Sequence, residues 1–289
     1  MKTVPHLINE RFSYIEISCL LEQPDLVIVT LDRPQKRNAI NSKFWKEIGQ
    51  VFEVISENGD CRCILLLGKG PAFCGGIDID DSSFFPVATA DSLSDVAHVG
   101  ITFLPKLRQM QACFTALEEC SIPIVVAVHG KCIGAGIDLI CAADIRICSP
   151  ETVFSVREVA IGLAADVGTL QRLPKITGNQ SLVNELCLTG RDFGSAEAIS
   201  MGLVSRVTNK LQEDAVYLCK IICSHSPVAV HGTKKALLYS RDHTVKDGLE
   251  QVGTYNALAL QSEDLPSAFA ARALKRKPEY RNLPHHSKL

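Results

Sequence analysis

Three acidic residues stand in stretches that are otherwise built mainly from small and apolar residues. Asp138 lies in IGAGIDL, Glu158 in REVAIGL and Asp166 in AADVGTL. A carboxyl group in apolar surroundings holds its proton more tightly than one in water, which suits it to proton transfer near neutral pH. Two of the three also have a purely structural explanation. Asp138 would be favourable near a helix N-terminus, and Asp166 would cap a helix running from Val167 to Leu173.

Three turns follow apolar stretches, the second and third of them bearing glycines, and they offer a second chemical element. They are DRPQKRNAIN (32–41), GKGPAFCGGIDID (68–80) and HGKCIGAGIDL (129–139). Turns of small residues let backbone N–H groups approach a substrate oxygen that becomes negative, although each turn alone could serve only as a tight connector. Gly134 and Gly136 do not extend into a dinucleotide-binding GxGxxG, because Leu139 stands where the last glycine is required, and there is no P-loop GK[ST].

The elements that must position these groups are short strands and amphipathic helices. Apolar, β-rich stretches predict buried strands at residues 26–32, 62–68, 122–128 and 143–148. Apolar residues at helical spacing from Phe44 to Ile55 predict a helix that starts at Asn41 or Ser42 and stops at Asn58-Gly59. The same spacing from Leu104 to Leu117 predicts another. Alternating strands and helices are typical of an α/β fold with parallel strands.

The pattern of apolar residues along the chain changes near residue 195. From there on helical patterns dominate, which predicts a core at 1–195 that carries the site and a C-terminal helical subdomain at 196–289 that serves oligomerisation. Residues 80–103 have no clear periodicity. We expect them to form a long loop or flap that shapes the substrate pocket.

Composition excludes several classes of function. The chain has 289 residues, 46% of them apolar, and a formal net charge of −2, so no global field attracts nucleic acid or an anionic membrane. No apolar run reaches membrane-spanning length, and the N-terminal residues lack a secretory signal. Neither a membrane span nor a nucleic-acid partner is expected.

Twelve cysteines are scattered through the chain without a CxxC pair or zinc-type spacing. They predict reduced thiols that pack as small apolar residues in an intracellular protein, and no metal site. The last residues, Ser287-Lys288-Leu289, form the peroxisomal import tripeptide. The sequence therefore predicts a peroxisomal protein recognised by the peroxisomal import receptor.

Taken in order, five motifs resemble the crotonase, or enoyl-CoA hydratase/isomerase, superfamily. They are LDRPQKRNAIN, FCGGIDI, IPIVVAVHGKCIGAGIDL, CAADIRICSPETVFSVREVAIGLAADVGTLQRLP and GLVSRV. Within that superfamily, IGAGIDL followed by REVAIGLAADVGTLQRLP is similar to the Δ3,5-Δ2,4-dienoyl-CoA isomerases. The resemblance implies a crotonase-type spiral of β-β-α units with a C-terminal helical assembly subdomain, and a homotrimer or dimer of trimers. It also implies an acyl-CoA substrate in fatty-acid β-oxidation, with no cofactor beyond the coenzyme A of the substrate.

The resemblance also assigns roles in the reaction. The backbone N–H groups of Ile77 and Ala135 would form an oxyanion hole, although the family usually has glycine at the second position. Hydratases of the family carry glutamates where this chain has Asp138 and Glu158, whereas the dienoyl-CoA isomerases show Asp, Glu and a further Asp, here Asp166. The reaction would remove a proton from C2 and deliver one at C6. We assign removal to Asp166 and delivery to Glu158, with the reverse order left open.

Coenzyme A and the rest of the substrate are expected to lie against the first two turns. The binding residues implied are Lys36, Arg37, Ala39, Cys74, Gly75, Gly76 and Asp78. Two other functions stay open. One is a 2-enoyl-CoA hydratase that uses Asp138 and Glu158, and the other is a non-catalytic crotonase-fold protein that serves assembly. Asp166 counts against the hydratase, because a third buried carboxylate is costly without a function.

Overall fold

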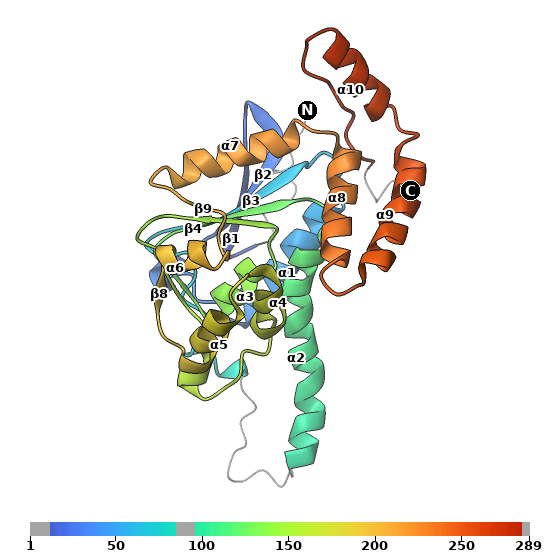
Figure 1. Cartoon of the computed structure of the whole chain (residues 1–289). Helices are drawn as coiled ribbons and strands as arrows, with labels where there is room; N and C mark the ends of the chain where they lie inside the picture. Colours follow the sequence, from blue (N-terminus) through green and yellow to red (C-terminus); the bar gives the residue numbers. More distant parts are fainter. Residues whose placement is uncertain (1–11, 85–95, 285–289) are drawn as a thin grey trace.

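The computed structural model describes residues 12–84 and 96–284, and its centre is a six-stranded sheet (Figure 1). The strand order is β1-β2-β3-β4-β6-β9, in which β1 runs antiparallel to β2 and every other pair is parallel. A second, three-stranded sheet has the order β5-β7-β8. The strands are β1 (Ile15–Leu20), β2 (Gln23–Leu31), β3 (Cys63–Gly68), β4 (Ile124–Val128), β5 (Lys131–Ile133), β6 (Ile145–Cys148), β7 (Val153–Ser155), β8 (Phe193–Gly194) and β9 (Arg206–Val207).

The four strands expected from the sequence are β2, β3, β4 and β6, and they pair in parallel as predicted. The α/β class is therefore confirmed. The small sheet and β9 were not foreseen, because strands of two or three residues are too short to show a period of two. β1 was also missed, although it forms the antiparallel edge of the large sheet.

Helices cover both faces of the large sheet. They are α1 (Ser42–Ser56), α2 (Val96–Glu119), α3 (Ala135–Cys141), α4 (Thr169–Ile176), α5 (Gln180–Thr189), α6 (Ser195–Ser200), α7 (Leu211–Cys223), α8 (Pro227–Tyr239), α9 (Val245–Ala259) and α10 (Asp264–Ala273). Three 3-10 turns accompany them, namely η2 (Pro34–Lys36), η3 (Ser82–Phe84) and η4 (Glu158–Ile161). The start of α1 agrees with the prediction, since the side chain of Asn41 accepts a hydrogen bond from the N–H of Phe44 at 2.8 Å.

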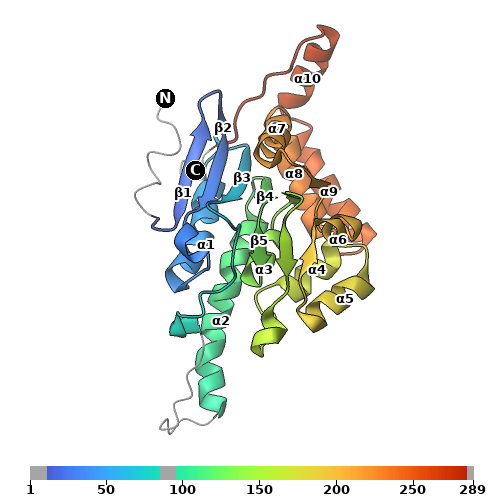
Figure 2. The same ribbon diagram turned by 90° about the vertical axis from the view of Figure 1, so that its left-hand side faces the viewer.

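The expected loop at 80–103 is partly wrong. Helix α2 begins at Val96 and extends well past the body of the molecule (Figure 2). Residues 85–95 lie outside the described residues. The sequence hid the helical part because Gly100 and Pro105 both disfavour a helix and because Val96 and Ile101 are exposed, which weakens the periodic pattern.

Residues 196–284, the described C-terminal part of the chain, are mainly helical, and helices α7 to α10 fall into two groups. Helix α7 packs on one face of the large sheet, where Ala215, Cys219 and Cys223 join a core cluster with sheet residues such as Leu26 and Leu65. Helices α8, α9 and α10 lie beyond the sheet, and α10 is the part farthest from it (Figures 1 and 2). The larger core lies on the opposite face and includes α1 and α3.

The twelve cysteines all fall within the described ranges, and all are free thiols. Burial raises the pKa of several of them, for example Cys74 and Cys141, to about 12. Among the residues that the structure describes, no helix is long and apolar enough to cross a membrane. Within the same ranges no group of three His, Cys, Asp or Glu side chains is arranged to hold a metal ion.

Candidate active site

One cavity of about 300 Å³ brings the second and third glycine turns together with all three acidic residues. Ile77 and Ala135 line it from the two turns, and Asp138, Glu158 and Asp166 line it from α3, η4 and the segment before α4. The remaining wall is mainly apolar, with Arg157 as its one cationic residue among those described. Its apolar side chains are Trp45, Ile79, Phe84, Phe103, Leu107, Met110, Ile133, Ile161, Leu163 and Val167. The cavity therefore has one polar end and an apolar body suited to a hydrocarbon chain.

The second turn leaves the N–H of Ile77 free. Ile40 forms an isolated parallel bridge with Ile77, in which its N–H donates to the carbonyl of Gly76 at 2.8 Å and its carbonyl accepts from Asp78 at 2.9 Å. Backbone N–H groups alternate in direction along an extended segment, so the amide of Ile77 points to the other side. It donates to no described residue. Gly76 has φ of 95°, a conformation that glycine adopts readily.

The third turn frees a second amide in a different way. The N–H of Gly134 donates to the carbonyl of Ser155 at 2.9 Å, and Ala135 follows as the first residue of α3. The first N–H groups of a helix have no acceptor within it, and the amide of Ala135 bonds to no other described residue. Gly134 has φ of 51°, and a Cβ there would lie 3.2 Å from Oε1 of Glu158. The carboxyl group therefore packs against the turn that holds Ala135.

Asp138 is fully buried and joins two helices. Its Oδ1 accepts a hydrogen bond of 2.5 Å from the N–H of Thr169, the first residue of α4, while its Oδ2 accepts none from any described residue. Burial raises its pKa to about 6, although the bonds from Thr169 oppose that shift. The sequence suggested that Asp138 is favourable at the start of its own helix. The structure shows that it also caps another helix, α4.

Glu158 opens the 3-10 turn η4 and is 8% exposed. Its Oε2 is buried and has no hydrogen-bond partner within the described ranges. Burial, and secondarily the charge of Asp138, raise its pKa to about 7. A substantial fraction of Glu158 is therefore protonated at neutral pH, so this side chain can donate a proton as well as accept one.

Asp166 lies at the mouth of the cavity. Two expectations about it need correction. It does not cap a helix, because α4 begins at Thr169 rather than Val167 and its N-cap residue is Gly168. Nor is it buried, since its residue class is exposed, and the argument from a costly buried carboxylate therefore fails. Partial desolvation still raises the pKa of its carboxyl group.

Of the four expected substrate-binding residues in the second turn, two line the cavity and two do not. Gly75 and Gly76 line the cavity, whereas Cys74 does not, and its Sγ donates to the carbonyl of Asn38. Asp78 forms an ion pair of 2.6 Å with Arg33, and the hydrogen bond from Arg33 lowers its pKa.

The remaining three lie on the first turn. Lys36 is exposed and pairs with Asp80 at 2.9 Å, and Arg37 has φ of 52° and accepts a hydrogen bond from Gly75 through its carbonyl. Ala39 is half-buried, and its carbonyl accepts a hydrogen bond from Arg33. None of these three lines the cavity.

The sequence analysis missed Asn38, which holds the first two turns together. Its side-chain nitrogen donates to the carbonyls of Lys69, Ala72 and Phe73, and its Oδ1 accepts from the N–H of Arg33. Asn38 is fully buried and has φ of 55°. An asparagine in a turn was the available signal, because asparagine tolerates this backbone conformation better than most residues.

The raised pKa values of Asp138 and Glu158 predict how stability depends on pH. The folded chain binds more protons than the unfolded chain between the ordinary and the raised values, so the stabilisation is present at low pH. It is lost as the pH rises through about 6 for Asp138 and about 7 for Glu158. Glu158→Gln should therefore flatten the decline in the free energy of unfolding over this range, by at most about 1.4 kcal/mol per pH unit.

Denaturant unfolding of wild type and variant, at several pH values from about 5 to about 8, measures this difference. Glu213→Gln serves as a control, because Glu213 is an exposed glutamate far from the cavity lining. Parallel pH curves for wild type and Glu158→Gln would contradict the prediction.

Comparison with known proteins agrees with the fold. The profile of the family described as "Enoyl-CoA hydratase/isomerase" matches residues 22–282. The chain therefore belongs to the enoyl-CoA hydratase/isomerase family.

Two relatives and one solved structure illustrate the likeness. The mitochondrial Δ3,5-Δ2,4-dienoyl-CoA isomerase of Rattus norvegicus is 42% identical over 283 residues, covering 96% of this chain and 84% of the relative. The peroxisomal Δ3,5-Δ2,4-dienoyl-CoA isomerase of Arabidopsis thaliana is 38% identical over 277 residues, covering 95% and 99%. A crystal structure of enoyl-CoA hydratase from Bacillus anthracis superposes with a TM-score of 0.81 at 24% identity, covering 93% of this chain and 99% of that one, which shows the common fold.

Proposed function

We propose that this protein is a Δ3,5-Δ2,4-dienoyl-CoA isomerase of fatty-acid β-oxidation. The observation that carries the proposal is the shared cavity. Three carboxyl groups line this mainly apolar pocket together with Ile77 and Ala135, whose backbone N–H groups donate to no described residue. The two relatives at 42% and 38% identity bear the same activity in their names. The substrate is an acyl-CoA, and no cofactor takes part beyond the coenzyme A that the substrate carries.

In the proposed reaction the thioester oxygen accepts hydrogen bonds from the N–H groups of Ile77 and Ala135. Asp166 takes a proton from C2, and the electron pair released is delocalised over the carbonyl and the two double bonds. Glu158 then donates a proton to C6, so that the double bonds move from positions 3 and 5 to positions 2 and 4. The reaction leaves Asp166 protonated and Glu158 ionised, and each regains its starting state before the next turnover.

The order of the two proton transfers follows from the environments of the two carboxyl groups. Glu158 is buried and has a pKa of about 7, which suits a group that must hold a proton before it acts. Asp166 is more exposed, and partial desolvation is the one cause that raises the pKa of its carboxyl group. It is the better base of the two, since an exposed carboxylate is ionised at neutral pH.

A 2-enoyl-CoA hydratase is the alternative within the family, and it would need only Asp138 and Glu158. The geometry favours the isomerase because Oδ1 of Asp138 is engaged in capping α4, which leaves the Glu158–Asp166 pair for proton transfer. One assay separates the two. Purified protein is offered a 3,5-dienoyl-CoA and a 2-enoyl-CoA, and the conjugated-diene absorbance is followed. Isomerisation supports the proposal, hydration alone supports the hydratase, and inactivity with both supports a non-catalytic assembly role.

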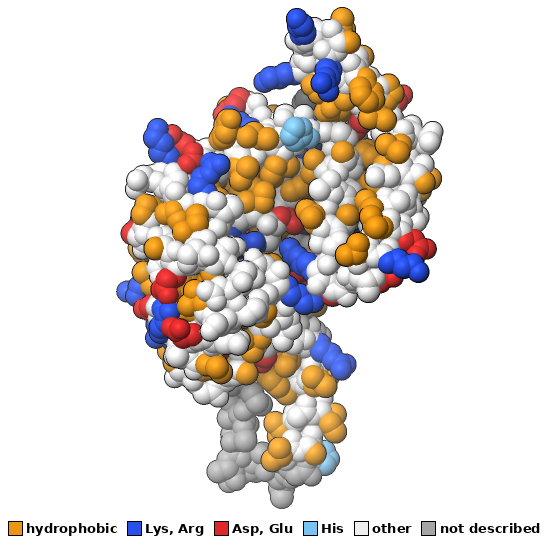
Figure 3. Space-filling view, in the orientation of Figure 1, with side chains coloured by type: hydrophobic (Ala, Val, Ile, Leu, Met, Phe, Trp, Pro, Cys, Tyr) orange, Lys and Arg blue, Asp and Glu red, His pale blue; other side chains and the backbone are white. Residues whose placement is uncertain are grey.

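We further propose that helices α8 to α10 assemble the protein into a homotrimer or a dimer of trimers. Helix α9 has 15 residues, none of them buried, and a helix of that length is marginally stable without packing. Exposed apolar side chains gather around α7, α8 and α10 (Figure 3). On the last three helices and their connections they include Leu237, Val245, Leu249, Leu258, Leu260, Leu265, Phe269 and Leu274. Light scattering after size-exclusion chromatography should give the mass of three or six chains, and a monomer would overturn this proposal.

We propose that the import receptor of peroxisomes recognises Ser287-Lys288-Leu289, which lie outside the described residues. Relatives occur in both candidate organelles, since the plant protein is named peroxisomal and the rat protein mitochondrial. A fluorescent protein fused before residue 1 should therefore colocalise with a peroxisomal marker, and removal of residues 287–289 should abolish this. A fusion that keeps residues 287–289 free at the C-terminus and yet shows no peroxisomal fluorescence would contradict the proposal.

A further inference from the structure

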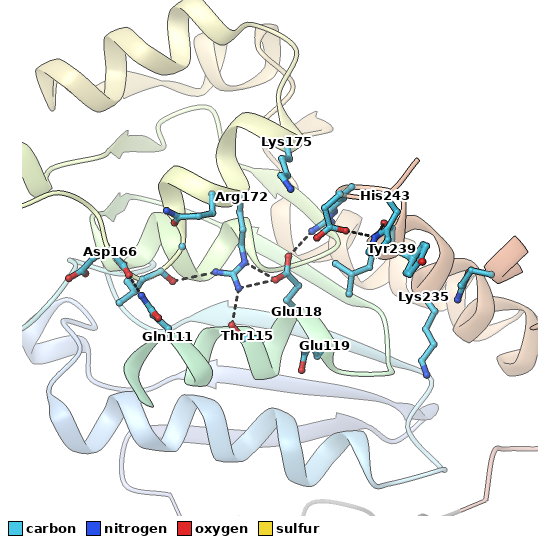
Figure 4. Close-up of a pocket in the computed structure, with 17 residues that line it drawn as sticks. Gln111, Thr115, Glu118, Glu119, Asp166, Arg172, Lys175, Lys235, Tyr239 and His243 are labelled. Atoms are coloured by element: carbon cyan, nitrogen blue, oxygen red, sulfur yellow. Dashed lines mark hydrogen bonds and ion pairs between the residues drawn. The ribbon is translucent and has the colours of Figure 1, made fainter. Parts of the chain in front are cut away.

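Asp166 belongs to two cavities at once. Besides the apolar cavity already described, it lines a second one of about 860 Å³ that lies between α2, α4 and helices α8 and α9 (Figure 4). The wall of this second cavity is rich in charge, and in it Arg172 and Arg241 both pair with Glu118. Asp166 and Val167 line both cavities, so the segment that carries them lies between the two. The position of its backbone determines where the Asp166 carboxyl group lies.

The backbone that follows the Asp166 side chain is held by side chains that line the second cavity. Nε2 of Gln111, on α2, donates a hydrogen bond of 2.7 Å to the carbonyl of Asp166 itself. Nη1 of Arg172, on α4, donates to the carbonyl of the next residue, Val167, at 3.3 Å. Figure 4 shows Gln111 and Arg172 beside this segment, with both hydrogen bonds drawn as dashed lines.

Each of the three nitrogens of the Arg172 guanidinium group donates a hydrogen bond. Nε donates to Oε2 of Glu118 at 2.8 Å, and Nη2 donates to Oγ1 of Thr115 at 3.1 Å. The side chain is only 12% exposed. Gly168 makes room for it, since a Cβ at that position would lie 1.8 Å from Nη1 of Arg172. The backbone there, with φ of 137°, is also one that side-chain-bearing residues rarely adopt.

Glu118 connects this arrangement to the C-terminal helices. Its second oxygen, Oε1, accepts a hydrogen bond of 2.9 Å from Nη1 of Arg241, just after α8. One carboxylate thus holds two arginines, one from α4 and one from the C-terminal part of the chain. Ion pairs of this kind, largely buried and hydrogen-bonded through each oxygen, fix geometry more firmly than exposed pairs do.

We infer that Arg172 is a positioning residue for Asp166, and that Glu118 and Arg241 hold Arg172 in place from α2 and the end of α8. This inference rests on the proposed function, because it assigns Arg172 a role in the proton transfer that Asp166 performs. Among the described groups that line the apolar cavity, Arg172 hydrogen-bonds only to the carbonyl of Val167. Its contact thus acts on the backbone of residues 166–168, while its charge also lowers the pKa of Asp138. An error of about 1 Å in the place of a reacting group costs about 10²-fold in rate.

The test is a double-mutant cycle on isomerisation of a 3,5-dienoyl-CoA. Arg172→Met should lower kcat by about 10²-fold with little change in KM, and Arg172→Lys should retain an intermediate rate because lysine can reach one acceptor but not all three. In an Asp166→Asn background, Arg172→Met should cost almost nothing further, since the group that it positions is already lost. Equal losses in both backgrounds would overturn the inference.

Arg191→Met is the matched control. Arg191 also lies between two glutamates, Glu185 and Glu197, yet it lines neither cavity. Its replacement should leave kcat within about 2-fold of wild type, because exposed ion pairs contribute little. Should Arg172→Met fail to fold, Thr115→Val removes one of the three contacts of Arg172 and should lower kcat in the same direction by a smaller factor.

Hydrogen exchange provides a readout that does not depend on activity. Arg172→Met should increase amide exchange of residues 166–169 selectively, and Arg191→Met should not. An inactive wild-type protein would defeat the proposed function while leaving this measurement valid. Unchanged exchange at 166–169 in Arg172→Met would overturn the inference even if the wild-type protein is an active isomerase.

Discussion

Asp166→Asn should lower kcat for the isomerisation of a 3,5-dienoyl-CoA by about 10²–10⁴-fold, the usual contribution of a general base. Asparagine has nearly the same size as aspartate but cannot take the proton from C2. The side chain lies at the mouth of the cavity and forms no helix cap, so its replacement should leave the fold intact. KM should change little, because the thioester oxygen and the apolar wall still bind the substrate.

Asp242→Asn is the control for this experiment. Asp242 lines only the larger, charged cavity, whereas Asp166 lines both. The control variant should keep the wild-type kcat, since it leaves every group of the smaller cavity in place. If Asp166→Asn retains a rate close to wild type, the base lies elsewhere and the assignment of C2 deprotonation to Asp166 is wrong.

Ala135→Pro should lower kcat by about 10²–10³-fold, the cost of removing one donor from an oxyanion hole. Proline has no N–H, so the substitution deletes the proposed second donor. Position 135 is the first residue of α3, where proline is tolerated because that N–H has no acceptor within the helix. The preceding Gly134 has no Cβ to clash with the proline ring. The fold should therefore survive a change that removes the charge-stabilising group.

Ala135→Gly separates the loss of the N–H from the effect of bulk at this position. Glycine keeps the amide and removes the methyl group, so kcat should remain within a few-fold of wild type, as an oxyanion-hole donor is defined by its N–H. Unfolding in denaturant checks that the proline variant is folded. A folded Ala135→Pro protein with wild-type kcat would show that the Ala135 amide does not bind the reacting oxygen.

Local patterns predicted much of the framework, for reasons visible in particular elements. Strands β2, β3, β4 and β6 are buried on both faces and therefore appear in the sequence as continuous apolar runs. Helix α1 shows its buried face at regular spacing and its cap at Asn41. Helix α2 was located correctly only in its C-terminal half, since its exposed N-terminal part is not packed against a core that would impose a pattern.

The functional groups of the site were likewise only partly predictable from local sequence patterns. Local signals in the sequence drew attention to Asp138, Glu158 and Asp166 and to the glycine turns, and the resemblance to the family pointed to Ile77 and Ala135 within those turns. The structure places all five residues in the lining of one cavity. The contacts that give these groups their properties join distant parts of the chain. Asp138 caps α4 across 31 residues, and Asn38 ties two turns together across 34 or 35.

Neither the burial of these groups nor their hydrogen-bond and ion-pair partners could therefore be predicted from a local sequence pattern. The exposure of Asp166, the pKa of about 7 at Glu158 and the link from Arg172 through Glu118 to Arg241 all depend on which segments pack together. Desolvation and hydrogen bonding act through space over a few ångströms, whereas sequence motifs report only neighbours along the chain. The amino-acid order specified which groups are present, and the packing of the chain set their protonation and their distances.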